Sequence, residues 1–199
     1  MKKLVVLFIG VSLLASCIFV NYLLSDDDLV WVSPYEYGDT ILYRYENYVD
    51  SLVITDKHIH NDYEFFAHSI GPTEHRGTAV VEGEMCHNGI LLDIFLLIQK
   101  TDDVTLRTNI WFSSRSYTEF LKTDIDPLVA KKINGIMYKD IVFIDNVDLE
   151  WGRRIRPYNV KKIYWSKSKG LIQYEYLPTD STQGAIYTYY KKLPYKQKK

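Results

Sequence analysis

All five histidines of the chain lie between residues 58 and 87, together with several acidic side chains. In KHIHNDYE, at 57–64, His58, His60 and Asp62 are spaced two apart, so an extended strand would place them in one row. Imidazole and carboxylate groups are ligands that zinc accepts in tetrahedral sites. The remaining candidate ligands are His68, His75 and His87. This stretch therefore predicts a candidate zinc site.

The same spacing also fits a strand that binds no metal. Leu52 and Ile54 share the parity of His58 and His60, so this face begins as a core face unless a turn or bulge at 56–57 resets the register. The sequence contains no HExxH or CxxC motif, and such spacing identifies zinc sites better than histidine density does. A polar, partly exposed strand is the interpretation that we favour. We expect no cofactor, with zinc as the alternative.

A second set of candidate side chains is cationic. Residues 17–150 contain 10 Lys and Arg against 23 Asp and Glu, or −13, whereas residues 151–199 contain 12 against 2, or +10. Arginine forks beside aromatic rings suit phosphate or acidic sugar groups. The candidate anion-binding residues are Arg153, Arg154, Arg156, Lys161 and Lys162. Alternatively, the first and last strands of a curled sheet meet, and their opposite charges neutralise each other there.

Aromatic side chains give a third signal, because several of the 17 tyrosines are spaced two apart. On strands, each pair would form a one-sided ladder, which can either stack on sugars or pack within the core. The pairs are Tyr35 and Tyr37, Tyr43 and Tyr45, Tyr174 and Tyr176, and Tyr187 and Tyr189. The sequence shows no GxSxG, P-loop or dinucleotide motif. We expect a binding or structural protein rather than an enzyme.

The sequence predicts that the elements carrying these residues are strands, because apolar and polar residues alternate over short runs bounded by Gly, Asn, Asp and Pro. Asn-Gly pairs at 88–89 and 134–135 are typical of two-residue hairpin turns. The predicted strands are 40–47, 50–59, 62–68, 78–87, 90–99, 104–112, 128–133, 136–144, 160–167, 171–177 and 184–192. The only helical alternative in this region is short, at 116–122.

Consecutive strands without long helices between them predict an all-β fold. About ten strands in an antiparallel meander must curl, so we expect a curved sheet or an incomplete barrel. If Cys17 is modified, as predicted below, Cys86 has no partner for an internal disulfide. The domain then depends on its own core for stability.

The amino-terminal segment MKKLVVLFIGVSLLASC has the layout of a secretory signal: two lysines, an apolar run and small residues before a cysteine. Its last four residues, 14–17, resemble the lipobox of bacterial lipoproteins. That resemblance implies cleavage after residue 16 and lipid attachment, such as palmitate, at Cys17. The alternative is an uncleaved transmembrane anchor, since 4–24 is nearly long enough to span a bilayer.

The predicted domains are a signal peptide at 1–16, a lipidated cysteine with an acidic tether at 17–29, one β-rich domain at 30–193 and a basic tail at 194–199. SDDD, at 25–28, resembles the acidic signal that sends bacteroidete lipoproteins to the cell surface. A solvated acidic linker is the other interpretation.

Two hairpin segments, YWSKSKGLIQYEY and INGIMYKDIVFI, resemble those of small bacterial envelope lipoproteins of unknown function. The resemblance implies an architecture and no active-site residue. We therefore expect a lipid-anchored outer-membrane protein of the cell envelope, on either the surface or the periplasmic side. Its β domain would bind a glycan, a lipid head group or an envelope protein, and no nucleic acid. The alternatives are a structural or assembly component and a zinc-binding protein.

Overall fold

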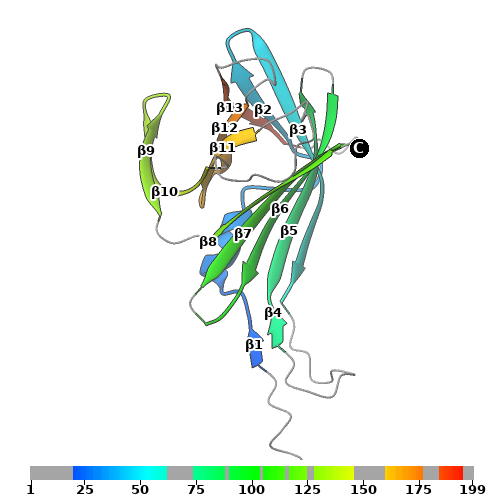
Figure 1. Cartoon of the computed structure of the whole chain (residues 1–199), viewed down its shortest axis with the longest axis vertical. Coiled ribbons are helices and arrows are strands. Elements are labelled where there is room, and N and C mark those ends of the chain that lie inside the picture. Colours follow the sequence, from blue (N-terminus) through cyan, green and yellow to red (C-terminus); the bar gives the residue numbers. More distant parts are fainter. Residues whose placement is uncertain are drawn as a thin grey trace, which may run out of the picture.

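The computed structural model describes residues 20–61, 74–87, 90–103, 105–114, 117–124, 128–145, 160–176 and 184–194. Eleven strands form one antiparallel sheet in the order β8-β7-β6-β5-β3-β2-β13-β12-β11-β10-β9. The predicted fold class, an antiparallel meander that curves without closing, is confirmed (Figure 1). These strands are β2 (Thr40–Tyr45), β3 (Tyr48–His60), β5 (Thr78–His87), β6 (Ile90–Lys100), β7 (Leu106–Ser114), β8 (Tyr117–Asp124), β9 (Val129–Ile133), β10 (Ile136–Asp145), β11 (Val160–Ser166), β12 (Gly170–Tyr176) and β13 (Ala185–Leu193).

The opening of the sheet lies between β8 and β9, which follow each other in sequence but do not pair. The first and last strands of the sheet's sequence, β2 and β13, are hydrogen-bonded neighbours in its middle. Curvature brings Cα atoms of β10 within 8 Å of β8. The sheet therefore wraps around one buried face while its two edge strands stay unpaired with each other.

Strand β5 shows why the alternating pattern predicts structure well. Its buried positions alternate with partly buried or exposed ones along TAVVEGEMCH, and its bounds match the predicted 78–87. It pairs with β6 in one unbroken register from Thr78↔Gln99 to His87↔Ile90. Apolar side chains on every second residue thus join one core, as a half-buried strand requires.

The helical alternative at 116–122 is wrong, because this segment forms β8 and pairs along its length with β7. A continuous cross-strand partner outweighs the weak local helix signal. The predicted strand at 62–68 lies outside the described residues. Two short strands, β1 (Val20–Tyr22) and β4 (Glu74–Arg76), form a separate parallel pair.

The short α-helix of the described chain lies in the acidic run, where α2 (Asp26–Leu29) continues into the 3-10 turn η1 (Val30–Val32). Ser25 and Asp28 form a capping box, in which each side chain accepts a hydrogen bond from the other residue's backbone N–H. Residues 25–29, which belong to the predicted acidic tether at 17–29, therefore form a capped helical turn that contacts the domain. A local hydrogen-bond motif, rather than hydrophobic periodicity, orders them.

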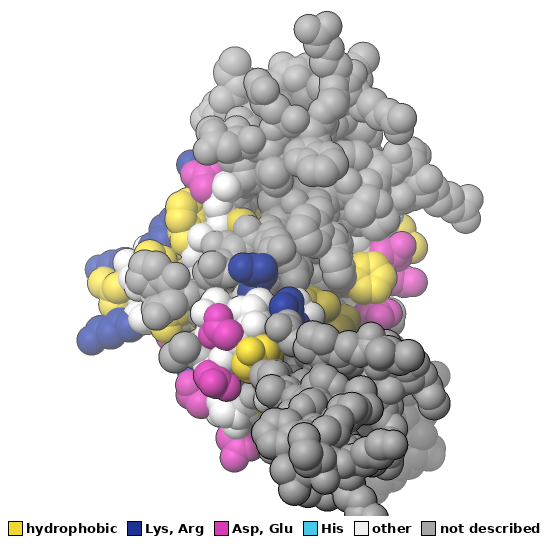
Figure 2. Space-filling model, turned by 60° about the horizontal axis from the view of Figure 1, so that its bottom comes forward, with side chains coloured by type: hydrophobic (Ala, Val, Ile, Leu, Met, Phe, Trp, Pro, Cys, Tyr) yellow, Lys and Arg dark blue, Asp and Glu magenta, His cyan; other side chains and the backbone are white. Residues whose placement is uncertain are grey.

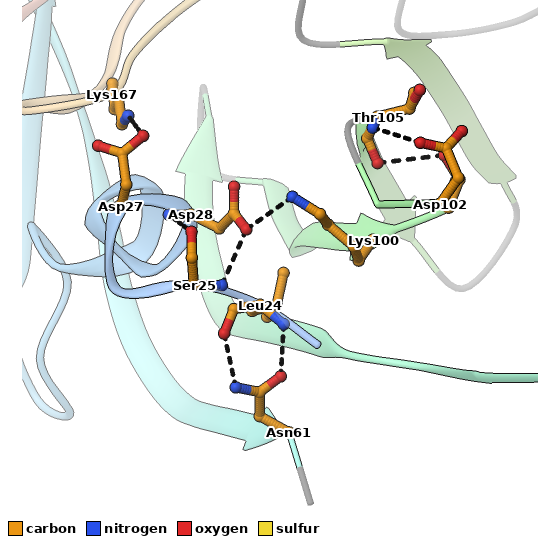
Figure 3. Close-up of polar contacts among 10 residues, drawn as sticks. Leu24, Ser25, Asp27, Asp28, Asn61, Lys100, Asp102, Thr105 and Lys167 are labelled. Carbon is orange, nitrogen blue, oxygen red and sulfur yellow. Dashed lines mark hydrogen bonds and ion pairs between the residues drawn. The ribbon is translucent and has the colours of Figure 1, made fainter. Parts of the chain in front are cut away.

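Contacts from distant strands hold this amino-terminal segment in place (Figure 3). Lys100 donates to Asp28 at 3.0 Å, and both side chains are largely buried. The side-chain amide of Asn61 accepts from the backbone N–H of Leu24 and donates to its carbonyl oxygen. Asp27 forms an ion pair with Lys167 at 2.5 Å. The sheet and the segment that precedes it thus form one folded unit.

Acid should weaken the Asp28–Lys100 ion pair. Burial by itself raises the pKa of Asp28, but hydrogen bonds from Ser25 and Lys100 outweigh that effect and hold the pKa below its ordinary value of 3.8. The folded protein therefore binds this proton less tightly than the unfolded chain. The resulting stability is fully present above the unfolded-state pKa and is lost as the pH falls through the folded-state pKa.

We expect Asp28→Asn to lower the free energy of unfolding at neutral pH by about 3 kcal/mol, because Lys100 keeps its charge in a buried place. Urea unfolding over a pH series would measure this loss. The difference from wild type should shrink below about pH 4, where the wild-type carboxylate is protonated too. A difference that stayed constant down to strong acid would contradict this role of the ion pair.

The other end of this segment closes one end of the curved sheet. Trp31 and Tyr35 are buried, and Trp31 packs edge-on against Trp165 with ring centroids 5.7 Å apart. The Tyr35 hydroxyl accepts a hydrogen bond from the backbone N–H of Leu171 at 2.6 Å. Burial raises the pKa of Tyr35 far above its ordinary value, so the hydroxyl stays protonated.

Gly170 and Gly135 give a matched test of this closure. Both have left-handed φ angles, of 79° and 83°. A Cβ at Gly170 would lie 2.6 Å from the Tyr35 hydroxyl oxygen and 2.7 Å from the ring carbon that bears it, whereas a Cβ at Gly135 would have nothing within 4 Å.

We expect Gly135→Ala to cost about 1 kcal/mol, the backbone penalty alone. Gly170→Ala should cost about 3 kcal/mol, because Tyr35 must also move out of its packed position. Chemical denaturation of both variants measures the difference. Equal losses would mean that Tyr35 does not pack against this turn.

Candidate functional site

A group of polar side chains lies inside the core at one end of the sheet. Asp50 and His87 are each 2% exposed, and His87 Nδ1 lies 2.5 Å from Asp50 Oδ2. The Tyr174 hydroxyl donates a hydrogen bond to the same carboxylate oxygen. We call Asp50, His87 and Tyr174 the polar cluster.

Strand parity explains why these three side chains point inward. Asp50 has the parity of the core residues Leu52 and Ile54 on β3, and His87 has the parity of Val81 and Met85 on β5. Tyr174 comes from β12, which is separated from β3 in the sheet by β2 and β13. A hydrogen bond between β12 and β3 therefore crosses the concave side, which requires the strong curvature of this part of the sheet.

Tyrosine rings surround the polar cluster. The His87 ring centroid lies 4.4 Å from that of Tyr176 and 5.1 Å from that of Tyr187. Tyr187 also stacks on Tyr174 with ring planes 3° apart, and Tyr43 meets Tyr174 edge-on. These tyrosines are buried, as the packing interpretation predicts for them, whereas Tyr37 and Tyr189 of the predicted pairs are exposed.

The polar cluster lies at the end of the sheet where β3 begins and where β5 and β12 end. Asp50 is close to the start of β3, while His87 and Tyr176 are the last residues of β5 and β12. The amino-terminal segment packs at the opposite end, where Tyr35 meets Gly170 at the start of β12. The domain thus has one end closed by aromatic packing and one end that carries polar groups.

This geometry fixes the orientation of the imidazole. The Asp50 carboxylate faces Nδ1 of His87, so Nδ1 carries a proton and donates it in a hydrogen bond to the carboxylate. Burial, followed by the nearby charge of Asp50, raises the pKa of Tyr174 well above its ordinary value. Tyr174 therefore remains a neutral donor to Asp50. A nucleophile paired with a base would be ionised or would point at that base. The Tyr174 hydroxyl is not ionised and does not point at His87.

The predicted histidine row lies on the opposite face of the sheet. A β-bulge between Ile54 and Asp56 shifts the register of β3 against β5. Such a reset was the condition under which His58 and His60 would leave the core face, and both are exposed. Their rings stack 6.2 Å apart, and His58 Nε2 lies 2.8 Å from an oxygen of Asp56.

The candidate zinc ligands do not converge in the described structure. His87 points into the core, whereas His58 and His60 point outward from the neighbouring strand. His75 lies on β4, and Asp62 and His68 lie outside the described residues. Among the described residues, no group of three or more His, Cys, Asp or Glu side chains is placed to hold a metal ion.

The candidate anion-binding residues are only partly described. Arg153, Arg154 and Arg156 lie outside the described residues, and so does the side chain of Lys161. Lys162 lies 3.5 Å from a carboxylate oxygen of Glu175. Of this predicted set, the structure thus describes the side chain of Lys162 alone.

Among the residues that the structure describes, two ion pairs connect the acidic and basic parts of the chain. Lys192 lies 2.5 Å from Asp39, beside the junction of β2 and β13, and Lys167 lies 2.5 Å from Asp27. These contacts support the alternative in which opposite charges neutralise each other where the two parts of the chain meet.

The polar cluster was missed by sequence reasoning, although a signal existed. A charged residue, Asp50, occupies the first position of the apolar row that continues with Leu52 and Ile54. Charged residues are almost never fully buried unless they are paired, so this position predicts a buried partner. Because the partners come from β5 and β12, only the folded sheet identifies them.

Comparison with protein-family models, curated proteins and solved structures finds no match. Within the described residues, no helix is both long and apolar enough to span a membrane.

Proposed function

We propose that the chain is a lipid-anchored protein of the cell envelope whose curved β domain binds a ligand or a partner. The observation that supports binding most strongly is the polar cluster with the tyrosines around it. It lies on the concave face, at the end of the sheet where β5 and β12 end. Small-molecule sites typically combine aromatic walls with a few fixed polar groups.

The energetics of the polar cluster support the same conclusion. Removing a carboxylate and an imidazole from water costs free energy that their contact only partly returns, and well-packed apolar residues often stabilise a core as well or better. A cluster at this position is therefore more easily explained by recognition than by stability alone. Catalysis has less support, because burial, together with the charge of Asp50, raises the pKa of Tyr174 and keeps its hydroxyl protonated.

The anchor follows from the proposed acylation of Cys17. Strand β1 begins at Val20, three residues after Cys17. Three extended residues span roughly 10 Å, so the folded domain would lie directly at the membrane surface. Stable attachment requires more than one acyl chain, as the resemblance to lipoproteins implies.

Native mass spectrometry of the full-length chain, extracted from membranes in mild detergent, tests the binding role. We expect an additional mass that is released on denaturation. Tyr174→Phe, which removes one hydroxyl from the polar cluster, should reduce its occupancy. Tyr37→Phe changes the same group on a side chain that is 66% exposed and should leave occupancy unchanged. A wild-type mass equal to that of the acylated polypeptide alone would count against a tightly held ligand.

A structural or assembly role is the second candidate, and one observation favours it. Strands β9 and β10 extend from the body of the sheet (Figure 1). They expose several apolar side chains. Exposed apolar patches rimmed by polar residues often mark protein interaction sites.

A further inference from the structure

The hairpin of β9 and β10, with the residue before it, forms a cationic and apolar projection that we call the arm (residues 128–139). It carries three lysines and no acidic residue. Four of its apolar side chains are 37–58% exposed. The lysines are Lys131, Lys132 and Lys139, and the apolar residues are Leu128, Val129, Ile136 and Met137.

The arm is a preformed surface. Asn134 and Gly135 both have positive φ angles, as a two-residue hairpin turn requires. On one face, Ile133 packs with Ile141 and Ile172 in a small second core. Binding through the arm would therefore require little ordering of the backbone, which lowers the entropic cost of association.

A complementary surface lies on the outer side of β3, β5 and β6, and we call it the acidic face. Asp56 is directly opposite Glu82, and Glu84 is directly opposite Asp93. Like charges in these cross-strand positions raise the free energy of the sheet. In the described structure, Glu84 and Asp93 form no ion pair that would relieve this repulsion.

The acidic face also has apolar members. Val53 and Leu91, each beside one of its carboxylates, are 38% and 56% exposed. A partner suited to this face would be cationic and apolar, which are the two properties of the arm. One chain thus carries two complementary surfaces, the arm and the acidic face.

The two surfaces lie apart within one molecule. The arm includes β9, which ends the sheet, whereas β3, β5 and β6 lie beyond β2 and β13. Figure 1 shows the arm on the left and β5 and β6 on the right. Figure 2 shows blue and yellow side chains together at the left edge of the molecule, and magenta beside yellow at the right edge.

We propose that the arm of one copy docks on the acidic face of a second copy. The contact is heterologous, so repeating it produces a ring or a row of copies. A rotation about the membrane normal can relate neighbouring copies, so all of them can be anchored in the same membrane. The inference rests on the proposed binding role of the domain and names a second copy as the partner.

Two other occupants of the arm fit less well. Pairing of two β9 edges would bring Lys131 and Lys132 of each copy close together, and edge lysines oppose such pairing. The anchoring membrane is out of reach, because Figure 1 places the loop of the arm at the end of the molecule away from β1. The acidic face of a second copy is complementary to the arm in charge, and the arm can reach it from its position on the molecule.

Sedimentation velocity of the full-length chain in detergent, over a range of concentrations, tests the contact. We expect wild type to self-associate, and added salt to weaken the association. The arm variant, Lys132→Glu with Lys139→Glu, and the face variant, Glu84→Lys with Asp93→Lys, should each raise Kd by roughly tenfold or more. Mixing the two variants should restore association, because every contact between unlike copies is again complementary.

Lys169→Glu with Lys191→Glu is the matched control, since both lysines are exposed and lie outside the arm. It makes the same change in net charge and should associate like wild type. Circular dichroism of every variant checks folding. Association that is equal in the arm variant and the control would overturn the proposal.

Cross-linking gives a second readout. Cys86 is an exposed free thiol on the outer side of β5, opposite Leu91 at the acidic face. Met137→Cys places a second thiol on the arm, and a short bismaleimide should then join Cys86 of one copy to residue 137 of another. Tyr37→Cys, also exposed but outside the arm, should give far less product.

A wild type that stays monomeric at every concentration would overturn the proposed contact. If that monomer retained a bound molecule in native mass spectrometry, the proposed binding function would still stand. If it instead bound vesicles of phosphatidylglycerol through the arm lysines, the occupant of the arm would be an anionic lipid surface and not a second copy.

Discussion

Asp50→Ala should lower the free energy of unfolding by about 4 kcal/mol, because His87 and the Tyr174 hydroxyl would lose their common acceptor in the core. Tyr174→Phe removes one hydrogen bond to a charged group and leaves the Asp50–His87 contact in place. Its expected cost is therefore smaller, about 2 kcal/mol. Urea denaturation followed by tryptophan fluorescence measures both losses.

Asp145→Ala is the control for Asp50→Ala, since Asp145 is exposed at the end of β10. Its effect should stay within about 0.5 kcal/mol. If Asp50→Ala were as mild as this control, the carboxylate would not be buried between His87 and Tyr174. The polar cluster, and the binding role that it supports, would then have to be abandoned.

Trp31→Ala should cost about 4 kcal/mol, the usual loss for a fully packed tryptophan. Trp31 is 2% exposed and packs edge-on against Trp165, so its removal leaves a cavity between η1 and β11. Hydrogen exchange should then accelerate at the backbone N–H of Leu171, which donates to Tyr35 in the same region. Thermal unfolding and hydrogen exchange measure the two effects.

Tyr37→Ala removes an aromatic ring from the same segment, but Tyr37 is 66% exposed and its loss should cost less than about 1 kcal/mol. A mild Trp31→Ala variant with unchanged exchange at Leu171 would show that the segment rests loosely on the sheet. The acidic run would then act as the flexible tether that its composition suggests.

The strands were predictable where side-chain alternation and turn chemistry agree. In β5, residues of one parity enter the core, and between β9 and β10 Asn134–Gly135 makes the expected turn. These signals are local in sequence. They identify the meander and its curvature, because eleven twisted strands cannot lie flat.

The remaining features depend on contacts between distant residues. The short helix is capped locally by Ser25 and Asp28, but its place against the sheet depends on Lys100, which is distant in sequence. The register of His58 depends on a bulge between Ile54 and Asp56, next to the predicted position at 56–57, and the sequence does not require a bulge at either place. The polar cluster needs β3, β5 and β12 to meet across the concave side, which no local pattern encodes.

Attachment of the β domain to the membrane is tested most directly by the intact mass of the mature chain, measured by mass spectrometry on protein extracted from its own membranes. We predict a polypeptide that begins at Cys17 and carries acyl chains on that residue. The first strand that the structure describes, β1, begins three residues later, at Val20. A chain that begins at Met1 and carries no fatty acid would contradict the anchor and the position of the domain at the membrane surface.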